Sequence, residues 1–143
     1  MAIHYYEQEV RADLRQKRNL TAFLKQLIKE KLGITNITIA FVFCNDEALL
    51  EKNIQFLQHD TLTDIITFDL SEDKTALVAE IYISVDRMRE NAQRFGVYYQ
   101  TELHRVIFHG VLHLCGYKDK SKADKALMRE MEDQCIQQYF AQR

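Results

Sequence analysis

The apolar residues of this chain recur with two periods, one typical of strands and one typical of helices. The clearest strand is predicted over residues 37–43, where every second residue is Ile or Phe. A stripe at helical spacing over residues 20–32 predicts a helix that begins after Asn19 and ends at Gly33. A short first strand is predicted over residues 3–6.

The middle of the chain predicts a β-hairpin with a helix on either side. Asn45 follows the Ile/Phe strand and is expected to cap a helix whose apolar stripe ends at Leu57. β-Branched residues over 63–68 and apolar residues over 77–84 predict two strands that pair as an antiparallel hairpin. Ser84 is the expected N-cap of the next helix. That helix is expected to bury Val85, Met88, Ala92 and Phe95 and to end at Gly96.

Two further helices are predicted near the C-terminus. In the first, the residues from Val106 to Cys115 are apolar or Gly except for two histidines, so this helix is expected to be buried on nearly every side. The second begins after Ser121, which has capping-box spacing to Asp124. Its inward-facing residues are expected to be Leu127, Met131, Cys135 and Tyr139.

Together these elements predict an α+β fold in a single domain over residues 1–143. About four strands are expected in one mixed sheet packed against several helices, with the histidine-containing helix at the centre. A chain of 143 residues is long enough to bury its own core. Hydrophobic residues make up 47% and charged residues 28%, which is typical of a globular protein and excludes global disorder.

Charge and cysteine content narrow the expected partners and compartment. The formal net charge is −2, so there is no global basic field, and any RNA contact must come from a local patch. Neither a membrane span nor a signal peptide is expected from the apolar runs. The three cysteines are widely spaced and odd in number, which favours a reducing cytoplasm over a disulfide framework.

Two histidines and an aspartate have the spacing of a catalytic zinc site. His109 and His113 are separated by about 400° of helix, so both lie on one face. Gly116 can end the helix and return the chain, which brings Asp119 toward the two rings. Three protein ligands would leave the fourth position of a zinc ion open for chemistry. The alternative is a pair of core histidines, whose hydrogen bonds would have to offset the burial of two imidazoles.

A run of basic residues follows the histidine helix. It contains Lys118, Lys120, Lys122, Lys125 and Arg129. Such a patch beside a metal could bind an RNA backbone, although a solvated helix face is the commoner origin of such a run. The remaining histidines, His4, His59 and His104, are expected at the surface or in loops.

Three blocks of this sequence resemble the YbeY family of metal-dependent endoribonucleases, the rRNA maturation factors of bacteria. The family's run HGxLHLxGYDH is similar to residues 109–119, and its block GDIxIS is similar to residues 79–84. A middle block, close to N-x-x-Y-R-x-x-D-x-P-T-D-V-L-S-F, is matched by Asn53, Phe56, Asp60, Thr63, Asp64, Ile65, Ile66, Thr67 and Phe68. The blocks occur in the family's order, so their joint match is more specific than the histidine spacing alone.

The resemblance implies a function, a cofactor and partners. It implies a single-strand-specific, metal-dependent endoribonuclease that acts late in rRNA maturation, at the 3′ end of 16S rRNA, and in ribosome quality control. One zinc ion per chain is expected, with His109, His113 and Asp119 as ligands and the two histidines acting in catalysis through the metal. RNA and ribosomal subunits are the expected partners, in the cytoplasm, with no membrane or DNA partner.

This chain departs from the family's pattern at two places. Asp119 stands where the family has its third His ligand, and a carboxylate oxygen can also bind zinc, at about 2.0–2.2 Å. Leu57 stands where the family has an Arg that acts at the substrate phosphate. The candidates to replace that cation are Arg87, Arg105 and Lys118.

Other polar residues have two interpretations each. Glu102 lies two helical turns before His109, where it could orient a ligand or be a solvated residue near the helix start. Thr63 and Asp64 could orient a ligand or the loop, or could form a side-chain turn that closes onto the strand.

Two alternative functions differ from the nuclease in class. A zincin peptidase carries Glu directly after its first His as the general base, whereas this chain has Gly110 there. A metallopeptidase would lack its general base and is therefore the less favoured alternative. In a nuclease, a metal-bound water with a pKa of about 7 can act without that Glu. A non-catalytic ribosome-assembly factor with a structural metal is the other alternative, made plausible by Leu57 and Asp119.

Overall fold

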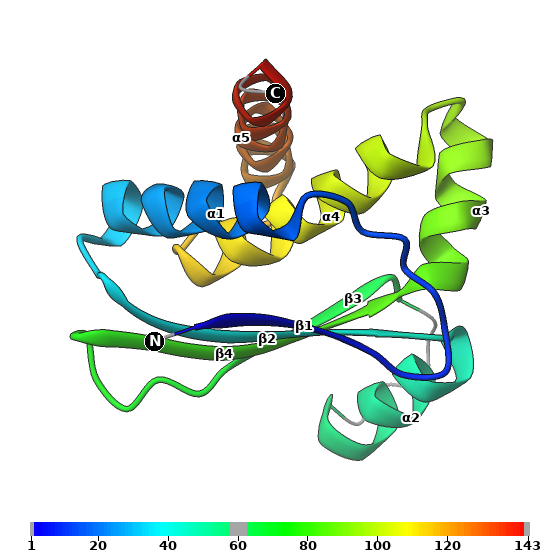
Figure 1. Cartoon of the computed structure of the whole chain (residues 1–143), viewed down its shortest axis with the longest axis horizontal. Helices are drawn as coiled ribbons and strands as arrows, with labels where there is room; N and C mark the ends of the chain where they lie inside the picture. The colour runs from blue at the N-terminus through cyan, green and yellow to red at the C-terminus, as the bar shows by residue number, and fades with distance from the viewer. Residues whose placement is uncertain (1, 58–62, 142–143) are drawn as a thin grey trace.

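The computed structural model describes residues 2–57 and 63–141, which form a four-stranded sheet covered by helices (Figure 1). The strands, in their order across the sheet, are β1 (Ile3–Glu7), β2 (Asn36–Cys44), β4 (Ala76–Ser84) and β3 (Ile65–Asp69). β1, β2 and β4 run parallel, and β3 runs antiparallel to β4. The sheet is therefore mixed, and both the predicted α+β class and the predicted hairpin are confirmed.

The helices cover the sheet unequally. In the described part of the chain they are α1 (Lys17–Leu32), α2 (Asp46–Leu57), α3 (Val85–Phe95), α4 (Tyr99–Leu114) and α5 (Lys122–Ala141). Figure 1 shows α1 and α4 across one face of the sheet, with α5 beyond them and α2 on the opposite side. None of these helices is long and apolar enough to cross a membrane.

The alternation predicted for β2 builds the main core. Its inward residues, from Ile37 to Phe43, are buried in one cluster with Ile81 and Ile83 of β4 and with the apolar faces of α1 and α4. The opposite face of the sheet carries only a small cluster, in which Leu49 of α2 is buried. The helices that matter for the site therefore lie on the heavily buried face.

Most predicted helix ends are confirmed, and one is wrong. The Asn45 side chain accepts a hydrogen bond from Ala48 N–H, and Ser84 caps α3 in the same way. α1 begins at Lys17 and not after Asn19, because Gln16 adopts a left-handed conformation and its carbonyl accepts the first helical hydrogen bond. Helices α1 and α3 end at Gly33 and Gly96, as predicted.

The burial of three side chains differs from what the sequence pattern predicts. Phe95 is 60% exposed, and Leu127 is 48% exposed. The inward face of α5 begins one residue later, at Met128, which is buried. His104 is buried in the main core against Phe108 and Tyr139, not at the surface.

Helix α4 is the central helix, as predicted. Its buried residues are Glu102, Leu103, His104, Val106, Ile107, Phe108, Gly110, Val111, Leu112 and Leu114. Gly110 faces the sheet: a Cβ at this position would lie 2.9 Å from Ile65 Cδ1 and 3.2 Å from Ile81 Cδ1. The missing side chain therefore lets α4 approach β3 closely, and it lets the histidines beside Gly110 lie over that edge strand.

A Schellman motif ends α4 and reverses the chain. Gly116 has a φ of +103°, and its N–H donates to the carbonyl of His113. Tyr117 N–H donates to the carbonyl of Leu112, which completes the motif. After this turn, Ser121 and Asp124 form the predicted capping box at the start of α5. The turn thus brings residues 117–121 back toward the histidine face.

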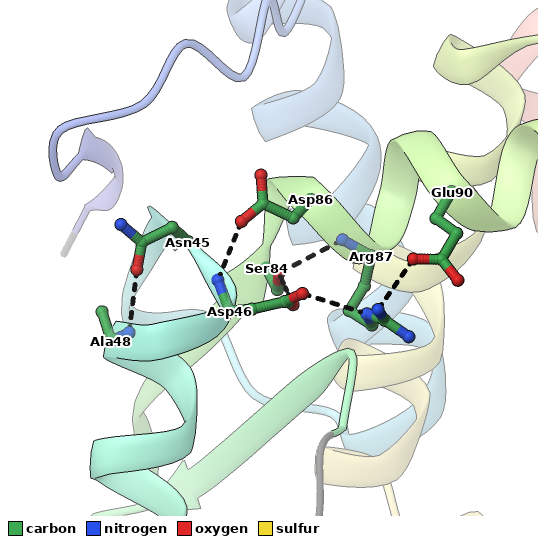
Figure 2. Close-up of polar contacts among 7 residues, drawn as sticks. All are labelled: Asn45, Asp46, Ala48, Ser84, Asp86, Arg87 and Glu90. Atoms are coloured by element: carbon green, nitrogen blue, oxygen red, sulfur yellow. Dashed lines mark hydrogen bonds and ion pairs between the residues drawn. The ribbon is translucent and has the colours of Figure 1, made fainter.

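A polar network fastens the starts of α2 and α3 to each other (Figure 2). Because β2 and β4 are parallel neighbours, the helices that follow them begin side by side. The Asp46 carboxylate accepts hydrogen bonds from the Ser84 hydroxyl at 2.6 Å and from Arg87 Nε at 3.3 Å. Asp86 accepts from the Asp46 N–H, and Arg87 also pairs with Glu90. The network fixes this corner of the sheet, next to the start of β3.

The close approach at Gly110 yields a first prediction. A Gly110→Glu substitution would place a charged side chain against Ile65 and Ile81, so we expect a loss of stability on the order of 3 kcal/mol or more. Gly110→Ala is the matched control: it should be nearly neutral, because a gain in helix propensity of about 1 kcal/mol offsets a shift of the Ile65 side-chain end. Chemical denaturation measures both, and a Gly110→Glu protein as stable as wild type would contradict the tight packing.

Candidate metal centre

The predicted site residues converge on one cavity. It has a volume of about 510 Å³ and lies between α4, α5, the last turn of α3 and the edge strand β3. The predicted residues that line this site cavity are Thr63, Asp64, Glu102, Arg105, His109, His113 and Asp119. Lys118 does not line it and is exposed in the turn after α4. The fold therefore brings together residues from segments that are far apart in the sequence.

His109 is held between two carboxylates. Its Nδ1 lies 2.6 Å from Glu132 Oε2, and its Nε2 lies 3.4 Å from Asp119 Oδ2. Glu132 projects from the middle of α5 and is only 6% exposed, so its contact with His109 is shielded from solvent. The ring is thereby fixed in orientation, with Nε2 directed toward Asp119.

The electrostatics of His109 follow from this arrangement. The hydrogen bond to Glu132 raises the pKa of His109, and the charges of Glu132, Asp119 and Asp64 act in the same direction, while desolvation opposes them. Because a carboxylate only accepts, Nδ1 carries the proton that is donated to Glu132. In the neutral ring Nε2 then carries the lone pair, and in the cationic ring it carries the second proton. Nε2 is the nitrogen that faces Asp119.

The separation of His109 Nε2 and Asp119 Oδ2 fits a shared metal ion. Two bonds of about 2.0–2.1 Å at the tetrahedral angle place their donor atoms about 3.3–3.4 Å apart. The observed 3.4 Å corresponds to that spacing and is long for a direct hydrogen bond. The Glu132 contact also matches the carboxylate–histidine pair that orients imidazole ligands in zinc sites.

His113 is less engaged than His109. It lies one turn further along the same helix and lines the same cavity, but its side chain is exposed. Across residues 2–57 and 63–141, no three His, Cys, Asp or Glu side chains are gathered closely enough to form a complete ligand set. Of the three predicted ligands, His109 and Asp119 lie next to each other. His113 lines the same cavity from the next turn of α4.

Two acidic residues, Asp64 and Glu102, line the site cavity together with Asp119. Burial raises the pKa of the Asp64 carboxyl and that of Glu102, the latter being 5% exposed. The charge of Asp64 also raises the pKa of Glu102, and the charge of Glu132 raises the pKa of both. The interpretation of Glu102 as a solvated helix residue is wrong, because it points into the cavity. Carboxyls whose pKa is raised by burial are candidates for proton transfer.

The start of β3 shows how Asp64 is placed. Ser84, a member of the corner network in Figure 2, donates its backbone N–H to the Asp64 carbonyl at 3.0 Å. The Thr63 hydroxyl donates to the Ile65 carbonyl at 3.3 Å, which is the local side-chain turn foreseen from the sequence. Thr63 therefore shapes the strand entry, while Asp64 presents its carboxyl to the cavity.

Glu132 is the site residue that the sequence analysis did not find. The sequence feature that could have revealed it is an acidic residue among the inward-facing positions of α5, which are Met128, Glu132, Cys135 and Tyr139. A buried acid at such a position needs a partner, and its partners are on α4: His109 and Arg105. Recognising it from sequence required the register of α5, which the exposed Leu127 obscures.

Two of the three candidate replacements for the family's arginine, Arg105 and Arg87, are already paired. Arg105 contacts Glu132 at 3.3 Å and Asp133 at 2.8 Å, and Arg87 contacts Asp46 and Glu90. Leu57 is the last residue of α2, and residues 58–62, with His59 and Asp60 of the family block, lie outside the described residues.

Basic residues of α5 lie next to the proposed ligands. Lys125 and Arg129 are exposed and line a smaller cavity of about 240 Å³ together with His109, Asp119 and Glu132. Arg129 also lines the site cavity. These two side chains therefore put positive charge at the rim of an otherwise acidic centre, where an incoming phosphate would meet it.

Comparison with known proteins places this site in a family. A family model described as Endoribonuclease YbeY matches residues 3–140. Proteins named Endoribonuclease YbeY include one from Bacteroides thetaiotaomicron, 42% identical over 139 residues that cover 95% of this chain and 98% of that protein. Another, from Cytophaga hutchinsonii, is 44% identical over 132 residues, covering 92% of this chain and 91% of that protein.

A solved structure shows the same fold. The solution structure of TM1509 from Thermotoga maritima is similar with a TM-score of 0.68 and 26% identity, covering 99% of this chain and 91% of that one. The resemblance seen in three short blocks thus extends over nearly the full length in both sequence and structure. This chain belongs to the YbeY endoribonuclease family.

Proposed function

We propose that this chain is a metal-dependent endoribonuclease that cuts single-stranded RNA in the site cavity, using one zinc ion held by His109, His113 and Asp119. The observation that carries the proposal is the clamped His109, whose Nε2 faces Asp119 at the spacing of two zinc ligands. Family membership supports RNA as the substrate, since the relatives are named endoribonucleases.

The protein side chains divide the work. Glu132 keeps Nδ1 of His109 protonated and the ring in place, which leaves Nε2 to face the ion. A bound zinc ion would supply Lewis acidity toward a phosphoryl oxygen and would make a coordinated water more acidic. Asp64 lines the same cavity and has a raised carboxyl pKa, so it is assigned to proton transfer at the attacking or leaving oxygen.

The rim of the cavity supports binding of an RNA backbone. Arg129 lines the site cavity and Lys125 the smaller cavity beside it, and three further exposed lysines, Lys118, Lys120 and Lys122, precede them in the sequence. Lys125 and Arg129 are on the same side of α5, next to Asp119. Their contacts with phosphates would make RNA affinity fall as salt rises.

The cellular role follows from the family resemblance. It supports rRNA as the substrate, with action late in maturation at the 3′ end of 16S rRNA and in quality control of ribosomal subunits. Such a substrate would place the chain in the cytoplasm, where Cys44, Cys115 and Cys135, all free thiols in this structure, remain reduced.

A non-catalytic assembly factor is the second candidate. It is favoured by the lack of the family's arginine at Leu57 and by the ion pairs that engage Arg87 and Arg105. A metallopeptidase is disfavoured by packing: a glutamate at position 110 would meet the sheet and not the cavity.

Loss of His113 separates the nuclease from the assembly factor. His113 is exposed, so His113→Ala should leave the metal-free fold and its melting temperature unchanged while RNA cleavage falls at least about 100-fold. His4→Ala, an exposed histidine on β1, is the control and should cut RNA like wild type. Cleavage of single-stranded and duplex RNA by zinc-loaded protein is the assay. A zinc-loaded wild type that never cuts RNA would sink the nuclease proposal and favour the assembly factor.

Zinc stoichiometry tests the ligand set independently of activity. Wild type should bind one zinc ion per chain, and Asp119→Ala should weaken the affinity at least about 10-fold because one ligand is lost. Asp119→His should keep zinc, since an imidazole can replace the carboxylate. Asp124→Ala is the control: this residue caps α5, so its loss should lower stability without changing zinc affinity. Native mass spectrometry and competition with a chelating dye measure both quantities; equal affinity in all four proteins would remove Asp119 from the site.

Glu132 should matter for zinc through His109. Glu132→Gln removes the charge that orients and polarises the ring, so zinc affinity should fall about 10- to 100-fold. Asp133→Asn provides a close control, because Asp133 also pairs with Arg105 but is exposed and makes no contact with His109. If both variants bind zinc equally well, Glu132 acts only as a partner of Arg105.

A further inference from the structure

Phe95 is an aromatic side chain that is largely exposed at the site cavity. It is the last residue of α3, it is 60% exposed, and it lines the site cavity together with His109 and Asp64. The helical stripe of α3 points toward the core as far as Ala92, but the helix ends at Gly96 before Phe95 can be covered. Single exposed aromatic side chains are common at protein surfaces, so what distinguishes Phe95 is its place in the lining of the site cavity, beside His109 and Asp64.

The groups around Phe95 match the parts of a nucleotide. Asn91 lies one helical turn earlier on the same face and lines the same cavity, so it places an amide next to the ring. The guanidinium of Arg94 lies 5.9 Å from the Phe95 ring centroid. A flat apolar surface, an amide with both a donor and an acceptor, and a cation are the groups that recognise a base and its phosphate.

We propose that Phe95 is a stacking platform for one unpaired nucleobase of the RNA, next to the phosphodiester that is cut, and that the Asn91 amide contacts the edge of that base. The inference rests on the proposed nuclease function and adds a substrate-specificity residue to it. Only an unpaired base can leave its neighbours and lie flat on a protein ring. Phe95 therefore selects single-stranded RNA at the cavity, which a metal site alone does not do.

A second exposed aromatic provides the matched control. Tyr98 is 85% exposed and lies only three residues further on. It lines a different cavity, with Arg89 and Tyr99, and not the site cavity. Loss of either ring removes a similar exposed apolar surface, but only Phe95 is placed to touch a base beside His109.

The first experiment measures cleavage of a short single-stranded oligoribonucleotide by the zinc-loaded full chain. Phe95→Ala should lower kcat/KM about 5- to 100-fold, mainly through KM, because base stacking is lost. Phe95→Tyr should stay within about threefold of wild type, and Phe95→Leu should fall with Phe95→Ala because stacking needs a flat ring. Tyr98→Ala should cut like wild type. Zinc content and melting temperature should be unchanged in all four variants.

The second experiment measures binding without cleavage, by fluorescence anisotropy of the labelled oligonucleotide with the zinc-loaded full chain, read before any cleavage is detected. Oligonucleotides that lack one base at successive positions should reveal a single position at which base loss weakens binding to wild type. At that position, base loss should have no further effect on Phe95→Ala. Equal losses in wild type and Phe95→Ala at every position, or equal behaviour of Phe95→Ala and Tyr98→Ala, would overturn the stacking platform.

The two experiments separate this inference from the nuclease proposal. If RNA binds through Phe95 but is never cut, the platform stands and the nuclease proposal fails. If RNA is cut and Phe95→Ala cuts equally well, the nuclease stands and the platform is wrong. A chain that neither binds nor cuts RNA refutes both.

Discussion

The hydrogen bond between His109 Nδ1 and Glu132 Oε2 is the interaction on which the site depends. At 2.6 Å, and with Glu132 almost fully buried, it joins the centre of α4 to the centre of α5. It fixes the tautomer of His109 and directs Nε2 into the cavity. The Schellman turn at Gly116 then needs only a few residues to bring Asp119 to that nitrogen. The geometry of the candidate ligands is therefore a consequence of how two helices pack.

The part of the cavity that contains Asp64 is positioned by a separate constraint. Parallel pairing of β2 with β4 sets two helix starts side by side, and the Asp46–Ser84–Arg87 contacts lock them. Ser84 then holds the backbone of Asp64, while Gly110 lets α4 come close enough for the histidines to face it. Ligands and proton-transfer groups thus belong to different elements that meet across a rigid sheet edge, which favours a preorganised site.

The local sequence pattern was enough to predict the helices and strands. It failed for side chains whose burial or partners depend on tertiary contacts. The alternation of β2 and the caps at Ser84 and Ser121 depend on residues close in sequence, and the structure places them as predicted. The turn after α4 brings Asp119 to His109, while His113 lines the same cavity from the next helical turn. Glu132 was missed because its role appears only when α5 packs on α4. The same packing turns Met128 inward in place of Leu127, a shift of one residue that the stripe alone does not resolve. His104 was expected at the surface and is buried, and Phe95 was expected in the core and is exposed. In both cases burial depends on which element packs against the residue, and the sequence pattern does not show that.

The charge distribution of the cavity explains why a divalent cation belongs to the proposed mechanism. Among the described lining residues, Asp64, Glu102, Asp119 and Glu132 are acidic, against Arg105 and Arg129 and the two histidines. A phosphodiester entering this space would meet net negative charge, because Arg105 is already neutralised by Glu132 and Asp133. The basic rim on α5 can attract RNA from a distance, but it cannot offset repulsion at the reacting phosphate. An ion with two positive charges between His109 and Asp119 would reverse the sign of the field at that point. The basic rim and the acidic centre would therefore act together. The rim would attract RNA, and the reacting phosphate would bind in the cavity only when the metal ion is present.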